Sequence, residues 1–245
     1  MTGRLRPVTP FSQESVACRC EWGPAGALAL ARADVTVVVD VFSFTTCVDI
    51  AAARGGAILP YRWNDPSAAA FAQAHAAELA GRRGQGRYSL APESFATAPA
   101  GLRCVLPSPN GAELTLAAAS TSAVVLAGCF RNARAVAAAA QQNGTSFNVL
   151  PAGERWPDGS LRPALEDWIG AGAILAHLPG TRSPEAEAAV ALFEHHRPSL
   201  IDALERCGSG REMEQRGHTR DKVLAAQLDI SDCAPRFDGE AFVAG

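Results

Sequence analysis

Polar side chains that could do chemistry follow four apolar runs of the sequence, at the point where each run ends. They are Asp40, Ser43, Thr45 and Thr46 after the first run, Ser108, Asn110 and Gly111 after the second, Gly128, Cys129, Arg131 and Asn132 after the third, and Gly153, Glu154 and Arg155 after the fourth. Ligands of open α/β sheets bind outside the carboxyl ends of the strands. We therefore expect the four turns to meet along one rim.

These residue types suit a phosphorylated ligand. A phosphate group is bound by backbone N–H groups at helix starts, by hydroxyl or amide donors, and by arginine or a magnesium ion. The expected catalytic residues are Asp40, Cys129 and Glu154. The expected substrate-binding residues are Ser43, Thr45, Thr46, Asn110, Gly111, Arg131, Asn132 and Gly153.

Carboxylates in the same segments could hold Mg²⁺, which usually takes one or two of them and leaves its other positions to water and substrate oxygens. The expected ligands are Asp40, Glu166 and Asp167, and Glu154 could serve as well. Each of these is also a common cap or turn residue. Glu166 and Asp167 fall inside a predicted helix, so a solvated helix face is an equal alternative for them.

Three familiar phosphate chemistries do not fit the spacing. A Cys-x5-Arg nucleophile needs arginine six residues after cysteine, but Cys129, Cys104 and Cys207 are followed there by alanine, asparagine and methionine. An Asp-x-Asp motif beginning at Asp40 would need an acid where the chain has Phe42. No Gly-x4-Gly-Lys-Ser/Thr loop occurs either, which excludes nucleotide hydrolysis of the P-loop kind.

The elements that must position these residues alternate between strands and helices. Continuous apolar runs predict strands at Thr36–Val39, Ala57–Leu59, Arg103–Leu106, Ala123–Leu126 and Phe147–Leu150. Alanine-rich stretches predict helices at Thr45–Ala53, Ser67–Ala80 (capped by Ser67), Ala112–Ala119, Asn132–Gln142 and Pro163–Leu178. The pattern predicts a three-layer α/β/α fold with a mainly parallel or mixed central sheet.

We expect one α/β domain over residues 1–245, with a mainly helical flank from about residue 183 that resembles a lid more than a second core. Gly81–Ala100 has no apolar period and reads as a long loop, whose Arg82, Arg83 and Arg87 could reach an anionic ligand. Asp229 and Asp232 could add carboxylates to the site if the last helix continues through them.

Composition narrows the class of protein. The net charge is −3, from 22 Lys+Arg and 25 Asp+Glu, so no broad positive field is available for nucleic acid or anionic lipid. No signal peptide or membrane-spanning run is recognisable, and the seven cysteines lack paired CxxC spacing. We expect a cytoplasmic protein with free thiols and a small phosphorylated acid as its partner. The sequence is compatible with a homodimer and does not fix the oligomeric state.

From about Val35 to Pro235 the sequence resembles the 2-phosphosulfolactate phosphatase family of coenzyme M biosynthesis. The motifs that carry the resemblance are Val37–Thr46, Pro109–Ala112, Ala127–Ala133, Ala152–Glu154 with Leu165–Asp167, and Ser209–Arg211 with Gln227–Asp232. The resemblance implies a magnesium-dependent α/β/α enzyme. It would hydrolyse the phosphate ester of a small sulfonated or carboxylated hydroxy acid, with Asp40 and the Asn110-Gly111 turn in its site.

Three departures from the family pattern leave a second hypothesis open. Family members usually have arginine where this chain has Ser43 and Glu113, and a Gly-Glu-Arg-type loop where it has Gly81-Arg82-Arg83-Gly84. Arg82, Arg83 or Arg131 could compensate. The alternative is a catalytically impaired relative that binds an anionic metabolite. A dinucleotide-dependent oxidoreductase ranks last, because the first strand is not followed by Gly-x-Gly-x-x-Gly.

Overall fold

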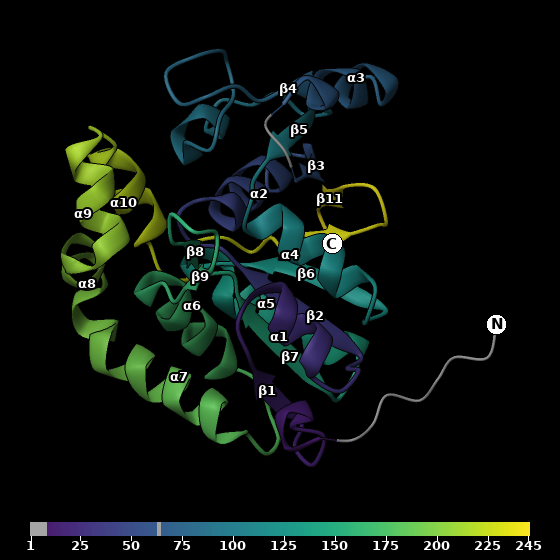
Figure 1. The fold of residues 1–245 in the computed structure, drawn as a ribbon, viewed down its shortest axis with the longest axis vertical. Helices are drawn as coiled ribbons and strands as arrows, with labels where there is room; N and C mark the ends of the chain where they lie inside the picture. The colour runs from purple at the N-terminus through teal and green to yellow at the C-terminus, as the bar shows by residue number, and fades with distance from the viewer. Residues whose placement is uncertain (1–8, 63–64) are drawn as a thin grey trace.

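A mixed sheet runs through the middle of the protein in its computed structural model, which describes residues 9–62 and 65–245 (Figure 1). In the described part of the chain the sheet has nine strands in the order β1-β7-β2-β6-β10-β11-β3-β5-β4. They are β1 Cys18–Cys20, β2 Val35–Val39, β3 Ala57–Tyr61, β4 Glu78–Leu79, β5 Arg103–Pro107, β6 Val124–Gly128, β7 Phe147–Pro151, β10 Arg236–Phe237 and β11 Phe242–Val243. A separate hairpin pairs β8 Glu154–Arg155 with β9 Leu161–Arg162.

Helices lie between and around these strands. They are α1 Gly23–Ala29, α2 Phe44–Ala52, α3 Pro66–Ala74, α4 Gly111–Ala119, α5 Ala133–Asn143, α6 Leu165–Leu175, α7 Pro184–His196, α8 Leu200–Arg206, α9 Gly208–Gln215 and α10 Thr219–Ala225. Short 3₁₀ helices occur at η1 Pro10–Ser12, η2 Pro92–Phe95, η3 Phe130–Asn132 and η4 Arg197–Ser199.

The sheet is built from two parallel halves. In one half β1, β7, β2 and β6 are parallel neighbours, and in the other β3, β5 and β4 are. The short β10–β11 ribbon lies between them and pairs antiparallel with β6 on one side and with β3 on the other. The fold prediction is confirmed in its mixed form.

Alternating side chains of β2 show the three layers. Val37 and Val39 belong to the apolar cluster that includes α5 and α6, whereas Val38 belongs to the cluster that includes α1, α2 and α4. All residues of β2 are buried, which explains why the strand reads as a continuous apolar run. Helices therefore cover both faces of the sheet, as predicted.

Two of the predicted helix boundaries are wrong. The helix predicted over residues 67–80 ends at Ala74, and its cap is Asp65, whose Oδ1 accepts the Ser67 N–H at 2.9 Å. Pro66 fixes the first turn immediately after Asp65, so Ser67 already lies inside the helix. The last helix, α10, ends at Ala225 and does not continue through Asp229 and Asp232, which lie outside any helix.

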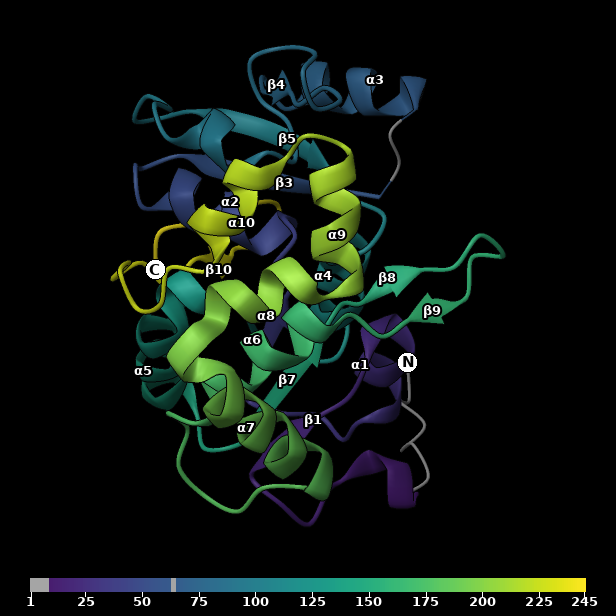
Figure 2. The same cartoon turned by 90° about the vertical axis from the view of Figure 1, so that its left-hand side faces the viewer.

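The first of the C-terminal helices, α7, packs against the main apolar core. Ala186, Ala189 and Phe193 of α7 are buried against α6. A Cβ at Gly172 of α6 would lie 2.0 Å from the Ala189 carbonyl oxygen, so glycine permits this close approach. Helices α8, α9 and α10 continue along the side of the molecule (Figure 2). No helix within residues 9–62 and 65–245 has the length and apolar character needed to cross a bilayer.

Candidate functional site

Asp40 lies directly after β2, and backbone N–H groups from two separate helix starts hold its carboxylate. Its Oδ1 accepts the Phe44 N–H at 3.1 Å and its Oδ2 accepts the Gly111 N–H at 2.9 Å. A Cβ at Gly111 would lie 2.6 Å from Asp40 Oδ2 and 2.5 Å from the Phe44 ring, so only glycine fits there. The turns after β2 and β5 therefore meet, as the sequence predicted.

Asp167, in the first turn of α6, joins a third turn to these two. Its Oδ1 accepts the Val41 N–H at 2.7 Å and its Oδ2 accepts the Gly153 N–H at 2.9 Å. The carboxylate thus ties the turn after β2 to the turn after β7. Asp167 and Glu166 are 3% and 1% exposed, which excludes the solvated helix face that was the alternative for both.

Glu154 and Glu166 complete a cluster of four carboxylates. Glu154 begins the β8–β9 hairpin, and its Oε2 accepts a hydrogen bond from Asn110 Nδ2 at 2.9 Å. Glu166 receives a contact of 3.4 Å from the Cys207 thiol at the start of α9. We call Asp40, Glu154, Glu166 and Asp167 the carboxylate cluster.

Burial and the charge of neighbouring acids raise the pKa of Asp40, Glu154 and Asp167. Burial is the main cause that raises the pKa of Asp40 to about 6, although the N–H groups of Phe44 and Gly111 oppose the shift. Burial, with the charges of Asp40 and Glu166, raises the pKa of Glu154 to about 7. The pKa of Asp167 is also raised, first by burial and then by its acidic neighbours. A partly protonated acid next to an ionised one is a usual acid–base arrangement.

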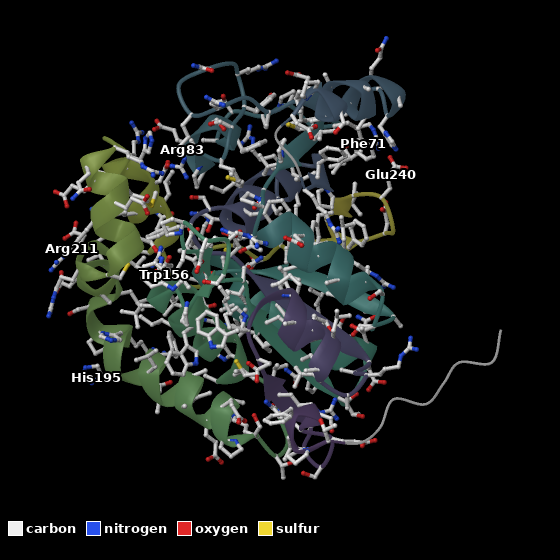
Figure 3. All side chains as sticks on the ribbon, in the orientation of Figure 1. Phe71, Arg83, Trp156, His195, Arg211 and Glu240 are labelled. Atoms are coloured by element: carbon white, nitrogen blue, oxygen red, sulfur yellow. The ribbon has the colours of Figure 1, made fainter. Side chains whose placement is uncertain are left out.

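Two arginines lie beside the cluster, and only one of them was considered in the sequence. Arg83 (labelled in Figure 3) donates from NH2 to Ser43 Oγ at 2.8 Å and is ion-paired with Asp221 of α10. Its charge lowers the pKa of Asp40, against the effect of burial. Arg162 lies directly across the hairpin from Glu154. Arg162 gave no sequence signal, because it follows a loop with no recognisable motif.

The threonines that were expected to bind substrate instead hold the backbone of the Asp40 turn. Thr45 Oγ1 donates to the Asp40 carbonyl at 2.8 Å and accepts the Asp40 N–H at 3.0 Å. Thr46 Oγ1 donates to the Val41 carbonyl at 2.9 Å. Both threonines are fully buried, so we assign them a positioning role.

The turn after β6 forms a separate cluster. Asn132 Oδ1 accepts the Cys129 N–H at 2.9 Å, and Asn132 Nδ2 donates to the Ala127 carbonyl at 3.2 Å. Arg131 Nε donates to buried Asp49 at 2.8 Å. Cys129 is fully buried, and burial raises the pKa of its thiol. Strand β6 ends at the same rim as β2, with Gly128 opposite Val39, but these contacts join the three predicted site residues to each other and to α2 and not to the carboxylate cluster.

The negative charge of the carboxylate cluster suits a divalent cation, but the carboxylates do not form a complete coordination site. In the described part of the chain, no group of three or more His, Cys, Asp or Glu side chains is arranged to hold a metal ion. Both oxygens of Asp167 already accept backbone N–H groups. Among the residues that the structure describes, no backbone N–H group donates to the Glu166 carboxylate. Both oxygens of Asp40 accept backbone N–H groups as well, so Glu166 is the carboxylate most available to Mg²⁺, an ion that needs only one or two carboxylates.

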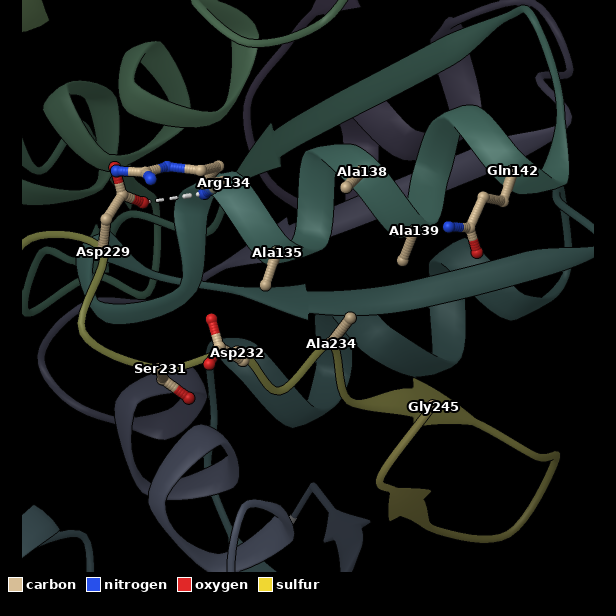
Figure 4. A pocket seen from close by; sticks show the side chains of 10 residues that line it. All are labelled: Arg134, Ala135, Ala138, Ala139, Gln142, Asp229, Ser231, Asp232, Ala234 and Gly245. Atoms are coloured by element: carbon tan, nitrogen blue, oxygen red, sulfur yellow. Dashed lines mark hydrogen bonds and ion pairs between the residues drawn. The ribbon is translucent and has the colours of Figure 1, made fainter.

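A groove of about 400 Å³ along α5 is a different feature (Figure 4). Its lining consists of small and polar residues from α5 and from the C-terminal segment: Arg134, Ala135, Ala138, Ala139, Gln142, Asp229, Ser231, Asp232, Ala234 and Gly245. Arg134 is already bonded to Asp229 through its backbone N–H and its guanidinium. None of the carboxylate cluster lines this groove, so Asp229 and Asp232 do not add to the site.

The α/β/α fold defines the class of this protein, together with the carboxylates from the turns after β2 and β7 and from α6 that converge on the Asn110-Gly111 turn after β5. It is a layered α/β protein with an acidic site at one rim of its sheet. Comparison with known proteins identifies the family. The sequence model of the 2-phosphosulpholactate phosphatase family matches residues 27–240. The chain belongs to this family, a group of phosphoric monoester hydrolases, and the resemblance that its motifs indicated is confirmed.

Two curated proteins are similar in sequence. A Gloeobacter violaceus protein named "Probable 2-phosphosulfolactate phosphatase" is 30% identical over 212 residues, which cover 83% of this chain and 88% of that protein. A cyclic β-(1,2)-glucan synthase of Rhizobium meliloti is 31% identical over 109 residues, but these cover 41% of this chain and only 4% of the synthase. The second match carries no functional argument because it covers so little of that protein.

Proposed function

We propose that the protein is a Mg²⁺-dependent phosphatase that hydrolyses the phosphate ester of a small sulfonated or carboxylated hydroxy acid. The observation that carries the proposal is the hydrogen-bonded convergence of Asp40, Gly111, Gly153 and Asp167. It unites residues from three strand ends and one helix at one point. Membership of the 2-phosphosulpholactate phosphatase family supports the same reaction class.

Asp40 and Glu166 would hold the magnesium ion, which when bound neutralises phosphoryl charge. Asp40 is kept oriented by the N–H groups of Phe44 and Gly111, and it either attacks phosphorus or takes a proton from the attacking water. Arg83, beside Asp40, supplies the cation that grips the phosphoryl oxygens.

Glu154 is suited to act as the general acid. A carboxyl group with a pKa of about 7 is still partly protonated at neutral pH. As the bond between phosphorus and the ester oxygen breaks, Glu154 gives its proton to the leaving alkoxide. Asn110 holds the Glu154 carboxyl group through Oε2, which leaves Oε1 for the proton.

The deciding experiment measures phosphate release from 2-phosphosulfolactate and from a panel of phosphorylated hydroxy acids, with Mg²⁺ and with EDTA. We expect turnover that is lost in EDTA and restored by Mg²⁺. If no compound on the panel is hydrolysed but one of them raises the melting temperature, the protein is instead a binder of anionic metabolites.

Where turnover is found, acid quench of a reaction with ³²P-labelled substrate separates the two roles of Asp40. Attack by the carboxylate leaves label on the protein, whereas attack by water leaves none.

A further inference from the structure

Arg162 is the one cation of the site whose charge no acid neutralises. Its guanidinium NH2 donates to Ser209 Oγ at 3.2 Å, and within residues 9–62 and 65–245 no carboxylate lies within ion-pair distance of it. Arg83, by contrast, is paired with Asp221, and Arg131 with Asp49. A partly buried guanidinium with spare donors is a ready partner for an anionic ligand.

The backbone pairing fixes where this guanidinium lies. Arg162 of β9 is directly opposite Glu154 of β8, so the two side chains project from the same face of the hairpin. Cβ atoms of such cross-strand neighbours are about 5 Å apart. Glu154 is turned to Asn110 and makes no ion pair with Arg162. An acid–base residue and an unpaired cation therefore lie side by side.

The surroundings keep Arg162 in this position. Its guanidinium carbon lies 5.7 Å from the centroid of the Trp156 ring, on the same hairpin. Ser209, which accepts its hydrogen bond, is 3% exposed and belongs to α9. The hairpin extends from the molecule as an arm (Figure 2), and the Glu154–Arg162 pair lies at the end of the ribbon away from its loop. The arm and α9 thus hold the cation from two sides.

We propose that Arg162 is the specificity-determining residue of the site. It binds the carboxylate or sulfonate of the substrate, so that the phosphate ester oxygen on the neighbouring carbon faces Glu154. This inference rests on the proposed phosphatase function. It predicts that kcat/KM depends on the distance between the acid group and the phosphate ester of the substrate, because Glu154 and Arg162 are fixed neighbours on a two-stranded ribbon.

Three available phosphate esters test whether Arg162 binds the acid group of the substrate. 2-Phosphoglycerate carries its phosphate on the carbon next to the carboxylate, 3-phosphoglycerate has the same composition with the phosphate one carbon further away, and glycerol 2-phosphate lacks the acid group. The wild-type enzyme should have its highest kcat/KM on 2-phosphoglycerate. Loss of a charge-assisted contact in Arg162→Ala should lower that value by about 10- to 100-fold, mainly through KM.

The same substitution should change kcat/KM on glycerol 2-phosphate by less than about 3-fold, since no acid group is left to lose its contact. Arg162→Lys should recover part of the discrimination. Arg216→Ala, which removes an exposed arginine of the α9 region, is the charge-matched control and should behave as wild type.

A purely structural Arg162 would give a different result. In that case all three probes would lose activity equally and the melting temperature would fall, and the proposal is overturned. An unchanged ratio between 2-phosphoglycerate and glycerol 2-phosphate also overturns it. Failure of the wild-type protein to hydrolyse any probe, 2-phosphosulfolactate included, would refute the phosphatase function itself, which is a distinct outcome.

Discussion

Replacing Glu154 by glutamine should stabilise the metal-free protein at pH 8 and have little effect at pH 5. In the folded state the pKa of Glu154 is raised from 4.5 to about 7, mainly by burial and then by Asp40 and Glu166. A group with a raised pKa contributes its full stability below the unfolded value, and that stability is lost as the pH rises through the folded value. Glutamine keeps an oxygen for Asn110 but carries no charge.

The size of the effect follows from the shift. At about 1.36 kcal/mol per pKa unit, the raised pKa of Glu154 corresponds to about 3 kcal/mol at pH 8. The side chain is partly exposed, so solvent screening reduces the expected gain in the free energy of unfolding to about 1–2 kcal/mol. For a chain of this length, each kcal/mol moves the melting temperature by about 2–4 °C.

Urea unfolding followed by tryptophan fluorescence, in EDTA at pH 5 and at pH 8, measures this gain. Glu187→Gln, on the exposed side of α7, removes the same charge from a solvated position and serves as the matched control. The reasoning is refuted if Glu154→Gln is no more stable than wild type at pH 8, or if its gain is the same at both pH values. Added Mg²⁺ should narrow the difference, because it stabilises the ionised wild-type cluster more than the variant.

Three further predictions concern the site and its supports. Asp40→Asn should lower kcat by about 10²–10⁴-fold with an unchanged circular dichroism spectrum; near-normal phosphate release would remove Asp40 from the mechanism. The kcat/KM of the wild type should fall above about pH 7, as Glu154 loses its proton, and a profile flat from pH 6 to 9 would contradict this role. Arg131→Met should lower the free energy of unfolding by about 3 kcal/mol, because it leaves Asp49 buried and unpaired, while kcat per folded molecule stays unchanged; a selective loss of kcat would instead place Arg131 in the site.

The regular part of the fold could be predicted from the sequence because its signal is local. The runs at residues 36–39 and 147–150 are β2 and β7 to within one residue at either end, since buried parallel strands consist almost entirely of apolar residues. The short strands β10 and β11 were missed. With two residues each, they exist only because β6 and β3 offer edges for pairing, which no local pattern encodes.

The site was predictable where it follows strand ends and unpredictable where it depends on side-chain direction. Asp40, Asn110, Gly111, Gly153 and Glu154 converge as expected because three strands end at one rim. Strand β6 ends beside β2 at the same rim, yet Arg131, in the turn after it, is directed to Asp49 on α2. Such a choice of partner depends on tertiary packing, and spacing along the chain does not determine it.

The position of the β10–β11 ribbon has a consequence for how the protein is made. Asp40 stands on one half of the sheet and Asn110 on the other, and residues 236–243 are the strip that joins the halves. A ribosome releases these residues long after both halves have emerged. The nascent chain must therefore wait with two uncovered strand edges, at β6 and β3, and such edges invite mispairing with other chains. Refolding yield, more than final stability, should be sensitive to changes in this strip.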